Sequence, residues 1–206
     1  MEPVTPPITP KQLGKGAYAK VARVGDLAVK TSISAAGITN RTVQESRIMR
    51  MAKGSGAGWQ IMPLLQATPT SITMPLMKGG SLFDLRTPMS VDWVIRTMKR
   101  VLLAINHVHA SGVVHGDVKG MNILFEDEDL EASDVVLGDF GMSFAKSRGC
   151  AFKEITPEAF RPPEHDHGIF TERGDLWSWA LCFLNTAMRL TESADAAKTF
   201  VFALGG

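Results

Sequence analysis

Residues 115–122, HGDVKGMN, carry an acid, a base and an amide close together between two short apolar runs. One apolar run, at 113–114, precedes this octet, and another, at 123–125, follows it. Short apolar runs bounded by polar and glycine-containing segments are typical of buried strands. The chain therefore gathers an acid, a base and an amide directly after an apolar stretch, and the rest of the sequence has to explain why.

Three side chains of this octet have chemical uses that fit together. Asp117 can accept a proton or orient a hydroxyl group, Lys119 can neutralise charge on a transferring group, and Asn122 can help to bind a divalent metal. A second carboxylate comes from GDFGMS, in which Asp139 follows the apolar run 135–137. Taken alone, Asp139 could be a turn residue and Asn122 a cap. Together and in this order they indicate metal-assisted phosphoryl transfer, in which positioning and charge neutralisation supply most of the catalysis.

The N-terminal part of the chain offers a place for phosphates. In LGKGAYAKV, Gly14 and Gly16 let the backbone approach a bulky anion, although two glycines in a hairpin usually form only a turn. Lys30 ends LAVK, an apolar run fit for a buried strand, where an unpaired ammonium is costly. Glu45, on the helix expected next, could pair with Lys30. The alternative is an ordinary lysine at the surface.

The expected elements are strands first and helices later. Strands are expected within 11–30, joined by hairpins, and again at 61–67 and 71–77. Helices are expected at about 41–53 with Val43, Ile48 and Met51 on one face, from the N-cap Ser90 to about Ala110, and at about 174–189. A length of 206 residues, 45% of them hydrophobic, fits one domain or two small lobes. This predicts an α+β chain in two lobes with a hinge near 78–80, after a Pro-rich flexible arm at 1–10.

Charge and composition exclude several classes of function. The net charge is +1 and there is no long Lys/Arg run, so we expect no nucleic-acid partner. No apolar run approaches membrane-spanning length, and residues 1–10 lack the apolar run of a signal peptide. Cys150 and Cys182 are too few for a disulfide framework and more typical of ordinary thiols than of nucleophiles. We expect an intracellular protein, in the cytoplasm or nucleus, without a membrane partner.

In their order along the chain, these motifs resemble those of a eukaryotic-type protein kinase, from about residue 11 to 190. LGKGAYAKV resembles the family's Gly-rich loop, LAVK its ATP-anchoring strand, and ITMPLMKGGSLFDL its hinge. HGDVKGMN resembles the catalytic loop, and DFG at 139–141 the metal-binding motif. RPPE at 161–164 resembles the end of the activation segment, and DLWSWA at 175–180 the helix that supports the catalytic loop through Asp175. The resemblance implies a bilobal protein-kinase-like fold, with a small β-rich N-lobe and hinge at 11–77 and a mainly helical C-lobe at 78–206.

The resemblance also assigns roles to single residues. Asp117 and Lys119 would be catalytic, and Asn122 and Asp139 would bind Mg²⁺. ATP would be bound by Leu13, Gly14, Gly16, Val21, Ala28, Lys30, Glu45, Met74, Pro75, Met77, Asp84 and Leu124. Within that set Lys30 and Glu45 would form an activating ion pair, Met74 would be the gatekeeper, and Asp84 would lie near the ribose. Met49, Leu64, His115 and Phe140 would stack between the lobes. A lysine at 119 is the pattern of members that phosphorylate serine and threonine in protein substrates.

Three departures from the family pattern stand out. Ala19 replaces the usual third glycine, and Gly116 replaces an arginine that in the family holds a phosphorylated activation segment. The chain also stops soon after the 175–180 motif, which implies a shortened C-lobe. In this compactness, and in having HGD at 115–117, the sequence resembles kinases encoded by large DNA viruses. Such a protein would act in an infected host cell. The apolar surface left on the 174–189 helix would then need cover from the tail at 200–204 or from a partner, such as another kinase.

Two other functions compete with an active kinase. A kinase-like interaction module, binding or inhibiting another kinase with little catalysis, is favoured by the missing helices and by Gly116. A small-molecule phosphotransferase of the antibiotic-kinase type also has HGD followed by an asparagine. The hinge motif GGSLFDL, the DFG triplet and RPPE fit that second family poorly.

Overall fold

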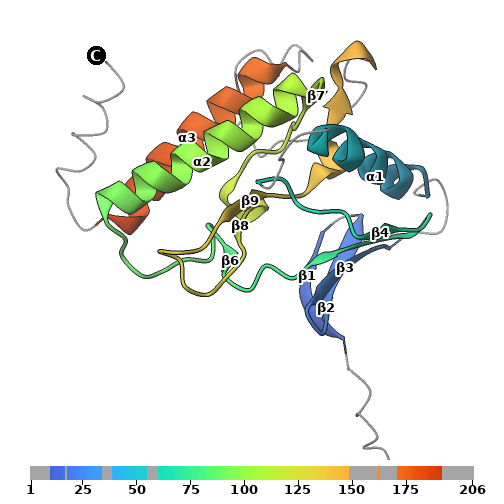
Figure 1. The fold of residues 1–206 in the computed structure, drawn as a ribbon, viewed down its shortest axis with the longest axis horizontal. Coiled ribbons are helices and arrows are strands. Elements are labelled where there is room, and N and C mark those ends of the chain that lie inside the picture. The colour runs from blue at the N-terminus through green and yellow to red at the C-terminus, as the bar shows by residue number, and fades with distance from the viewer. Residues whose placement is uncertain are drawn as a thin grey trace, which may run out of the picture.

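Five antiparallel strands from the first part of the chain form one sheet in the computed structural model, at the lower right of Figure 1. The structure describes residues 10–16, 18–33, 39–54, 60–148, 162 and 171–191. The strand order is β1-β2-β3-β5-β4, with bounds β1 Lys11–Lys15, β2 Ala19–Val24, β3 Leu27–Ser32, β4 Gln66–Ala67 and β5 Ser71–Pro75. The turn from β2 to β3 contains Gly25 at φ 63°, a left-handed conformation that favours glycine. The hairpins expected at 11–30 are therefore confirmed.

The strand expected at 61–67 is wrong over most of its length. Only Gln66–Ala67 pairs in the sheet, as β4. Ile61 and Met62 turn away from it and are buried against β9 (Val135–Leu137), where Ile61 makes an isolated bridge to Leu137. Met62 donates its backbone N–H to the Leu137 carbonyl. Pro63 has no N–H to give to a ladder, so the strand pairing stops there.

The helix expected at 41–53 exists as α1, Thr39–Lys53, and two of the three residues expected on its apolar face, Ile48 and Met51, pack against the core. The third, Val43, was predicted wrongly: it is 47% exposed, whereas Thr42, Glu45 and Met49 are buried. These buried residues follow helical spacing, so the inward face is partly polar. It is turned so that Glu45 reaches the ammonium of Lys30 on β3.

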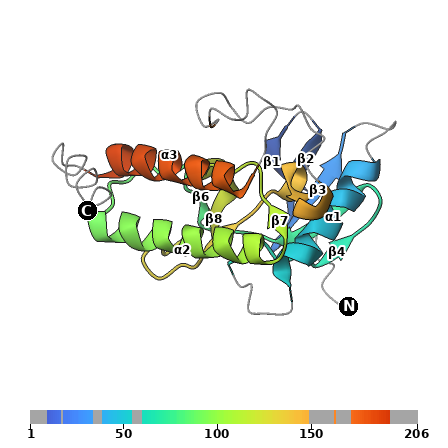
Figure 2. The same ribbon diagram turned by 90° about the horizontal axis from the view of Figure 1, so that it is seen from above.

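The second half of the described chain is mainly helical, as expected. Helix α2 spans Val91–Ala110, and its N-cap Ser90 accepts a hydrogen bond from Trp93 N at 3.1 Å. Helix α3, Glu172–Leu190, lies side by side with α2 in both ribbon views (Figures 1 and 2). The Trp179 indole of α3 donates to the Met98 carbonyl of α2 at 3.0 Å. No helix among the described residues is long and apolar enough to span a bilayer.

Short strands and turns connect the sheet to the helices. β6 (Gly80–Ser81), β8 (Ile123–Phe125) and β9 form a three-stranded sheet, and β7 (Val113–Val114) pairs with β10 (Phe144–Ala145). The described residues include 3₁₀ turns η1 at Gly120–Asn122, η2 at Phe140–Met142 and η3 at Lys146–Arg148. The loop 115–122 therefore follows β7 and leads into β8. The apolar runs at 123–125 and 135–137 form β8 and β9, which pair with each other.

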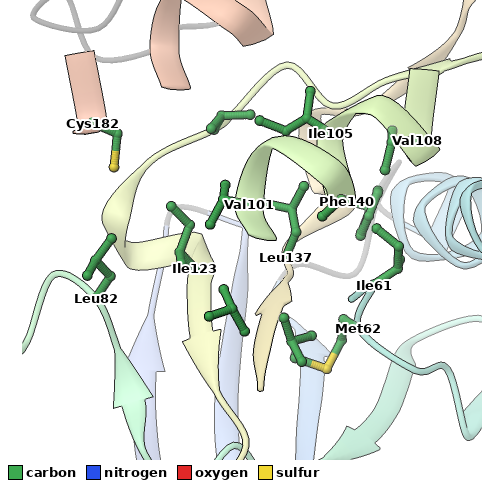
Figure 3. Close-up of a cluster of buried hydrophobic side chains, with 14 of the residues drawn as sticks. Ile61, Met62, Leu82, Val101, Ile105, Val108, Ile123, Leu137, Phe140 and Cys182 are labelled. Carbon is green, nitrogen blue, oxygen red and sulfur yellow. The ribbon is translucent and has the colours of Figure 1, made fainter. Parts of the chain in front are cut away.

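One hydrophobic core contains side chains from the five-stranded sheet, the short strands and the helices. Figure 3 shows side chains of α2, β8, β9 and η2 packed together, among them Val101, Ile123 and Phe140. Cys182 of α3 is buried nearby, and burial raises the pKa of its thiol to about 11. A thiol with that pKa stays protonated at neutral pH, as expected for a structural residue. The α+β, two-part architecture is confirmed. The arm at 1–9, Cys150, Glu164 and the tail at 192–206 lie outside the described residues.

Candidate functional site

The start of the loop 115–122 is anchored by hydrogen bonds to Asp175, in the first turn of α3. One carboxylate oxygen of Asp175 accepts the backbone N–H of His115 and the other accepts that of Gly116, both at 2.8 Å. His109, at the end of α2, contacts the same carboxylate at 2.8 Å. Asp175 is 2% exposed, so these bonds are shielded from water and hold the start of the loop tightly.

Gly116 is required by the geometry of this loop. Its φ is +78°, and a Cβ atom at this position would lie 2.9 Å from the Met142 carbonyl oxygen. A side chain would therefore be strained both by its own backbone and by the η2 segment. The departure from the family's arginine is thus matched by a backbone shape that favours glycine.

The three polar side chains of the octet are brought together. Lys119 Nζ lies 2.7 Å from Asp117 Oδ2, and Asn122 Nδ2 donates to the same oxygen at 3.0 Å. Asn122 Nδ2 also donates to the Asp117 carbonyl at 2.7 Å. Asp117 and Asn122 are both buried. The carboxylate is therefore held in one orientation, as a group that receives a proton has to be.

A second charged cluster joins the five-stranded sheet, α1 and η2. Lys30 Nζ lies 2.7 Å from Glu45 Oε1 and 2.7 Å from Asp139 Oδ1. Asp139 adopts φ +59°, and its Oδ1 also accepts the Gly141 N–H at 3.3 Å. Of the three side chains, Lys30 and Glu45 are largely buried, whereas Asp139 is 46% exposed. The sequence left Lys30 open between a buried pair and a surface position, and the structure places it in a pair.

The pKa values of this cluster are coupled. Burial by itself would lower the pKa of Lys30, but the carboxylates of Asp139 and Glu45 outweigh burial and raise it. Burial raises the pKa of Glu45, and Lys30 opposes part of that rise. Burial would also raise the pKa of Asp139, but its pair with Lys30 lowers it below the usual range. Lys30 therefore keeps Asp139 ionised and available as an oxygen ligand.

The two clusters are connected through the backbone before Asp139. Gly138 donates its N–H to the Asn122 carbonyl at 2.8 Å, and the Gly138 carbonyl lies 3.1 Å from His115 Nε2. The His115 ring meets the Phe140 ring edge-on, with centroids 4.8 Å apart. Phe140 and Met49 share one buried cluster with Leu64 partly buried against it, which agrees with the expected stack. The two clusters are therefore joined by a continuous set of backbone hydrogen bonds and ring contacts.

The Gly-rich segment lies at the exposed edge of the five-stranded sheet. Gly14 pairs with Val21, and Val21 pairs with Lys30, so these three stand on adjacent strands. Beyond β1 the turn is closed by Gly16 N donating to the Ala19 carbonyl at 2.8 Å. The Tyr18 ring carries the Arg41 guanidinium of α1 at 4.1 Å from its centroid. This cation–π contact ties the Gly-rich segment to α1.

The other residues expected at ATP are placed around these clusters. Ala28 pairs with Met74 across β3 and β5, and both are buried. Leu124, on β8, packs against Gly138: a Cβ atom added to Gly138 would lie 3.2 Å from Leu124 Cδ1. Asp84 Oδ2 accepts a hydrogen bond from Ser81 Oγ at 2.6 Å. No hydrogen bond or ion pair among the described residues joins Leu13, Pro75, Met77 or Asp84 to the two charged clusters.

Three contributors were missed by sequence reasoning: His109, Tyr18 and Arg41. No local pattern separates His109 from His107, because its partner Asp175 lies 66 residues further along the chain. Tyr18 and Arg41 are likewise joined only by folding. The one local signal was the aromatic side chain of Tyr18, which lies between Gly16 and the strand β2.

The donors around Asp139 fit Mg²⁺. Among the described residues no group of three or more His, Cys, Asp or Glu could hold a metal ion by itself. Mg²⁺, however, is usually bound through one or two carboxylates together with substrate phosphates. Asp139 is half-open to solvent, and both hydrogen bonds from Asn122 to Asp117 use its amide nitrogen, which leaves the amide oxygen for a cation.

Comparisons with known proteins point to one family. A model described as the protein kinase domain matches residues 8–199. A probable myosin light chain kinase of Dictyostelium discoideum is 27% identical over 179 residues, covering 81% of this chain and 57% of the relative. The death-associated protein kinase dapk-1 of Caenorhabditis elegans is 26% identical, over 81% of this chain and 13% of its own length. The serine/threonine-protein kinase H1 of Homo sapiens is 27% identical, over 81% and 42%. The chain thus spans less than two thirds of each of these relatives.

Proposed function

The chain belongs to the protein kinase family, and from this premise we propose that it transfers the γ-phosphoryl group of ATP to serine or threonine hydroxyls of a protein substrate. The observation that carries the proposal is the joining of the two charged clusters. Lys30, Glu45 and Asp139 form one, and Asp117, Lys119 and Asn122 form the other. Their connection through Gly138 supports a single site that binds a phosphate donor and activates a hydroxyl.

Each side chain then has a defined task. Asp117 orients the substrate hydroxyl and accepts its proton, because its carboxylate is held in place by Lys119 and Asn122. Lys119 neutralises charge on the oxygens of the transferring group. Lys30, kept in position by Glu45, contacts the phosphates of ATP. Preorganised charges of this kind supply most of the rate in phosphoryl transfer.

Asp139 and Asn122 would hold Mg²⁺ through a carboxylate and an amide oxygen. When bound, the ion neutralises negative charge on the phosphates. Asp139 reaches that position because its left-handed backbone turns the side chain toward Lys30. The sheet residues Val21, Ala28 and Met74, with Leu124 from β8, are proposed to enclose the adenine.

The preference for serine and threonine rests on two observations. Lys119, two residues after Asp117, is the pattern of the Ser/Thr-directed members that this sequence resembles. One of the similar proteins carries serine/threonine-protein kinase in its name. Lys119 also occupies space beside the Asp117 carboxylate, at 2.7 Å. We infer that an aliphatic hydroxyl is the acceptor at this site.

The proposal is tested with purified protein, Mg²⁺, ATP labelled at the γ-phosphate, and a mixture of proteins that contain serine, threonine and tyrosine. We expect label on serine and threonine. Asp117→Asn keeps the size of the side chain but removes its basicity, so transfer should fall on the order of 10²- to 10⁴-fold. Asp92→Asn, at an exposed position of α2, is the matched control and should retain full transfer.

Two results would point elsewhere. Stabilisation of the protein by Mg·ATP without transfer would favour an interaction module that keeps the nucleotide site. Neither transfer nor an ATP-dependent change in melting temperature would contradict the kinase proposal. Label that is equal in the wild type and in the Asp117→Asn variant would show that Asp117 does not activate the hydroxyl.

A further inference from the structure

Two large apolar side chains are exposed at the loop 115–122, which carries Asp117 and Lys119; one lies within the loop and the other beside it. Phe83, just beyond β6, is 53% exposed, and Met121, within η1, is 57% exposed. Single exposed apolar residues are common on protein surfaces. These two, however, are neighbours in space and stand at the edge of the proposed acceptor site.

Backbone pairing brings the two residues together. β6 runs antiparallel to β8, with Ser81 opposite Leu124. The pairing continues past β6, because Phe83 N donates to the Gly120 carbonyl at 3.1 Å. A Cβ on Gly120 would lie 3.3–3.5 Å from the Phe83 backbone and its Cβ. Phe83 is therefore packed against the residue that directly precedes Met121.

The outward direction of both side chains is set by their neighbours. Leu82, next to Phe83, is 0% exposed and belongs to the core. Asn122, next to Met121, is 5% exposed and bonded to Asp117. At both places the neighbouring side chain points inward, and an apolar one is presented to solvent. Neither Phe83 nor Met121 is needed to fill the core, so their exposure can serve binding.

The charges beside this surface select what can bind there. Arg86 donates to the Phe83 carbonyl at 2.7 Å, and its Cζ lies 5.9 Å from the Phe83 ring centroid. Lys119, two residues before Met121, adds a second positive charge and lies 2.7 Å from Asp117. Asp84, the nearest carboxylate in sequence, accepts a hydrogen bond from Ser81. A basic side chain over Phe83 would meet the repulsion of Arg86, whereas an apolar one would remove the ring and the thioether from water.

We propose that Phe83 and Met121 bind a large apolar side chain of the protein substrate, close in sequence to the phosphorylated serine or threonine. Lys119 and Met121 are two residues apart, a span of at most about 7 Å. An extended substrate with its hydroxyl at Asp117 would thus place a residue within about three positions of the acceptor over this surface. The inference rests on the proposed kinase function and adds the substrate class.

The test uses a set of peptides with one serine and otherwise small polar residues. Each of the three positions on either side of the serine is replaced in turn by leucine, alanine or arginine. We expect kcat/KM of the wild type to be on the order of tenfold higher with leucine than with alanine or arginine at one of these positions. The Phe83→Ala/Met121→Ala double variant should lose that preference through a higher KM for the leucine peptide.

Two further variants separate binding from general damage. Met121→Leu keeps an apolar side chain and should keep the preference. Leu103→Ala removes another exposed apolar side chain, 59% exposed on α2, and should leave both preference and rate unchanged. The affinity for Mg·ATP, measured by calorimetry, should be the same within twofold in all of them.

The outcomes divide cleanly. If the wild type transfers phosphate but shows no preference for leucine, or prefers arginine at these positions, the inference is overturned and the kinase function stands. It is also overturned if the double variant keeps the leucine preference, or if it loses Mg·ATP affinity as well. If the wild type phosphorylates no peptide and no protein, the proposed function fails and this inference fails with it.

Discussion

The loop 115–122 and the Gly-rich segment are two parts of one proposed site, but they differ in how deeply their residues are buried. In the loop at 115–122, His115, Asp117 and Asn122 are buried and hydrogen-bonded. In β1 every residue is exposed, and a Cβ on Gly14 would meet no described atom within 4 Å. The same addition at Gly116 would meet a carbonyl oxygen at 2.9 Å.

This difference separates two properties of the protein. Asp117 and Asn122 are buried and hydrogen-bonded to each other, so substituting either one should affect both the stability of the fold and the proposed proton transfer. The segment proposed to cover the phosphates is exposed along β1 and has open space at Gly14, so a change at Gly14 should alter nucleotide affinity and leave stability intact. The following predictions test that separation, from the largest expected effect to the smallest.

Asp175→Ala should have the largest effect on folding. It leaves the backbone N–H groups of His115 and Gly116 and the His109 ring without their shared acceptor. We expect a loss of about 4 kcal/mol in the free energy of unfolding, from unsatisfied buried polar groups. For a chain of this size that lowers Tm on the order of 10 °C. Asp175→Asn, which keeps one acceptor oxygen, should lose less. Equal melting of Asp175→Ala and wild type would show that the loop is not anchored there.

Lys30→Met should destabilise the protein by about 3 kcal/mol, because it leaves Glu45 buried without its cation. Its effect should depend on pH. In the wild type the pKa of Asp139 is lowered, so its contribution to stability is present above its unfolded pKa and lost as pH falls through the folded one. Without Lys30 the folded pKa values of Asp139 and Glu45 rise, and stability then falls as pH increases through them.

The difference in Tm between wild type and Lys30→Met should therefore grow from about pH 5 to about pH 8, as measured by thermal melting. Lys78→Met removes an exposed lysine, 3.7 Å from the exposed Asp26, and is the matched control. It should change Tm little at any pH. A difference that shrinks as pH rises would contradict the role given to Lys30.

Gly116→Ala and Gly14→Ala form a matched pair. Gly116→Ala forces a side chain into a left-handed turn against the Met142 carbonyl and should cost about 2 kcal/mol. Gly14→Ala should leave Tm unchanged and weaken Mg·ATP binding, because the added methyl group stands where the phosphates are proposed to lie. Melting curves and calorimetric titration with Mg·ATP measure both. If the two variants lost stability equally, the contrast between the two regions would be wrong.

The smallest expected effect concerns the contact between Tyr18 and Arg41. A cation–π pair at this exposure is worth about 0.5–1 kcal/mol, which corresponds to a two- to fivefold change in affinity. Tyr18→Ala, Arg41→Ala and the double variant should raise the Kd of Mg·ATP by similar factors, because each removes the same contact. Tyr18→Phe keeps the ring and should bind as the wild type does. Additive effects in the double variant would show that the two residues act independently.

Much of this arrangement was predictable because its signals are local. Ser90 is a recognisable N-cap, so the start of α2 was predicted correctly, and the short apolar run at 123–125 forms the strand β8. The cost of a buried ammonium indicated Glu45 as a candidate partner for Lys30, but a surface position stayed open until the family resemblance implied the pair. These inferences start from neighbouring residues and general energetics.

The remaining errors and omissions arise from contacts between distant segments. Val43 was placed inward by apolar periodicity, but α1 is turned by the partner that Glu45 has on β3. Ile61 was expected in a strand of the sheet and instead bridges to Leu137, 76 positions later in the chain. The requirement for glycine at 116 depends on the Met142 carbonyl and could not be read from HGD alone.

The hydrogen bonds that Asp175 accepts from His115 and Gly116 also affect the order in which the chain can fold. This acceptor lies 60 residues after His115, beyond β8, β9 and η2. While the chain is being synthesised, the whole octet leaves the ribosome long before the carboxylate that holds its left-handed turn. Such long-range contacts form late in folding, after the entropy of closing the intervening loop has been overcome. A nascent chain that already carries Lys30, Asp117, Asn122 and Asp139 is therefore expected to lack an ordered loop at 115–122 until α3 has been made and has docked.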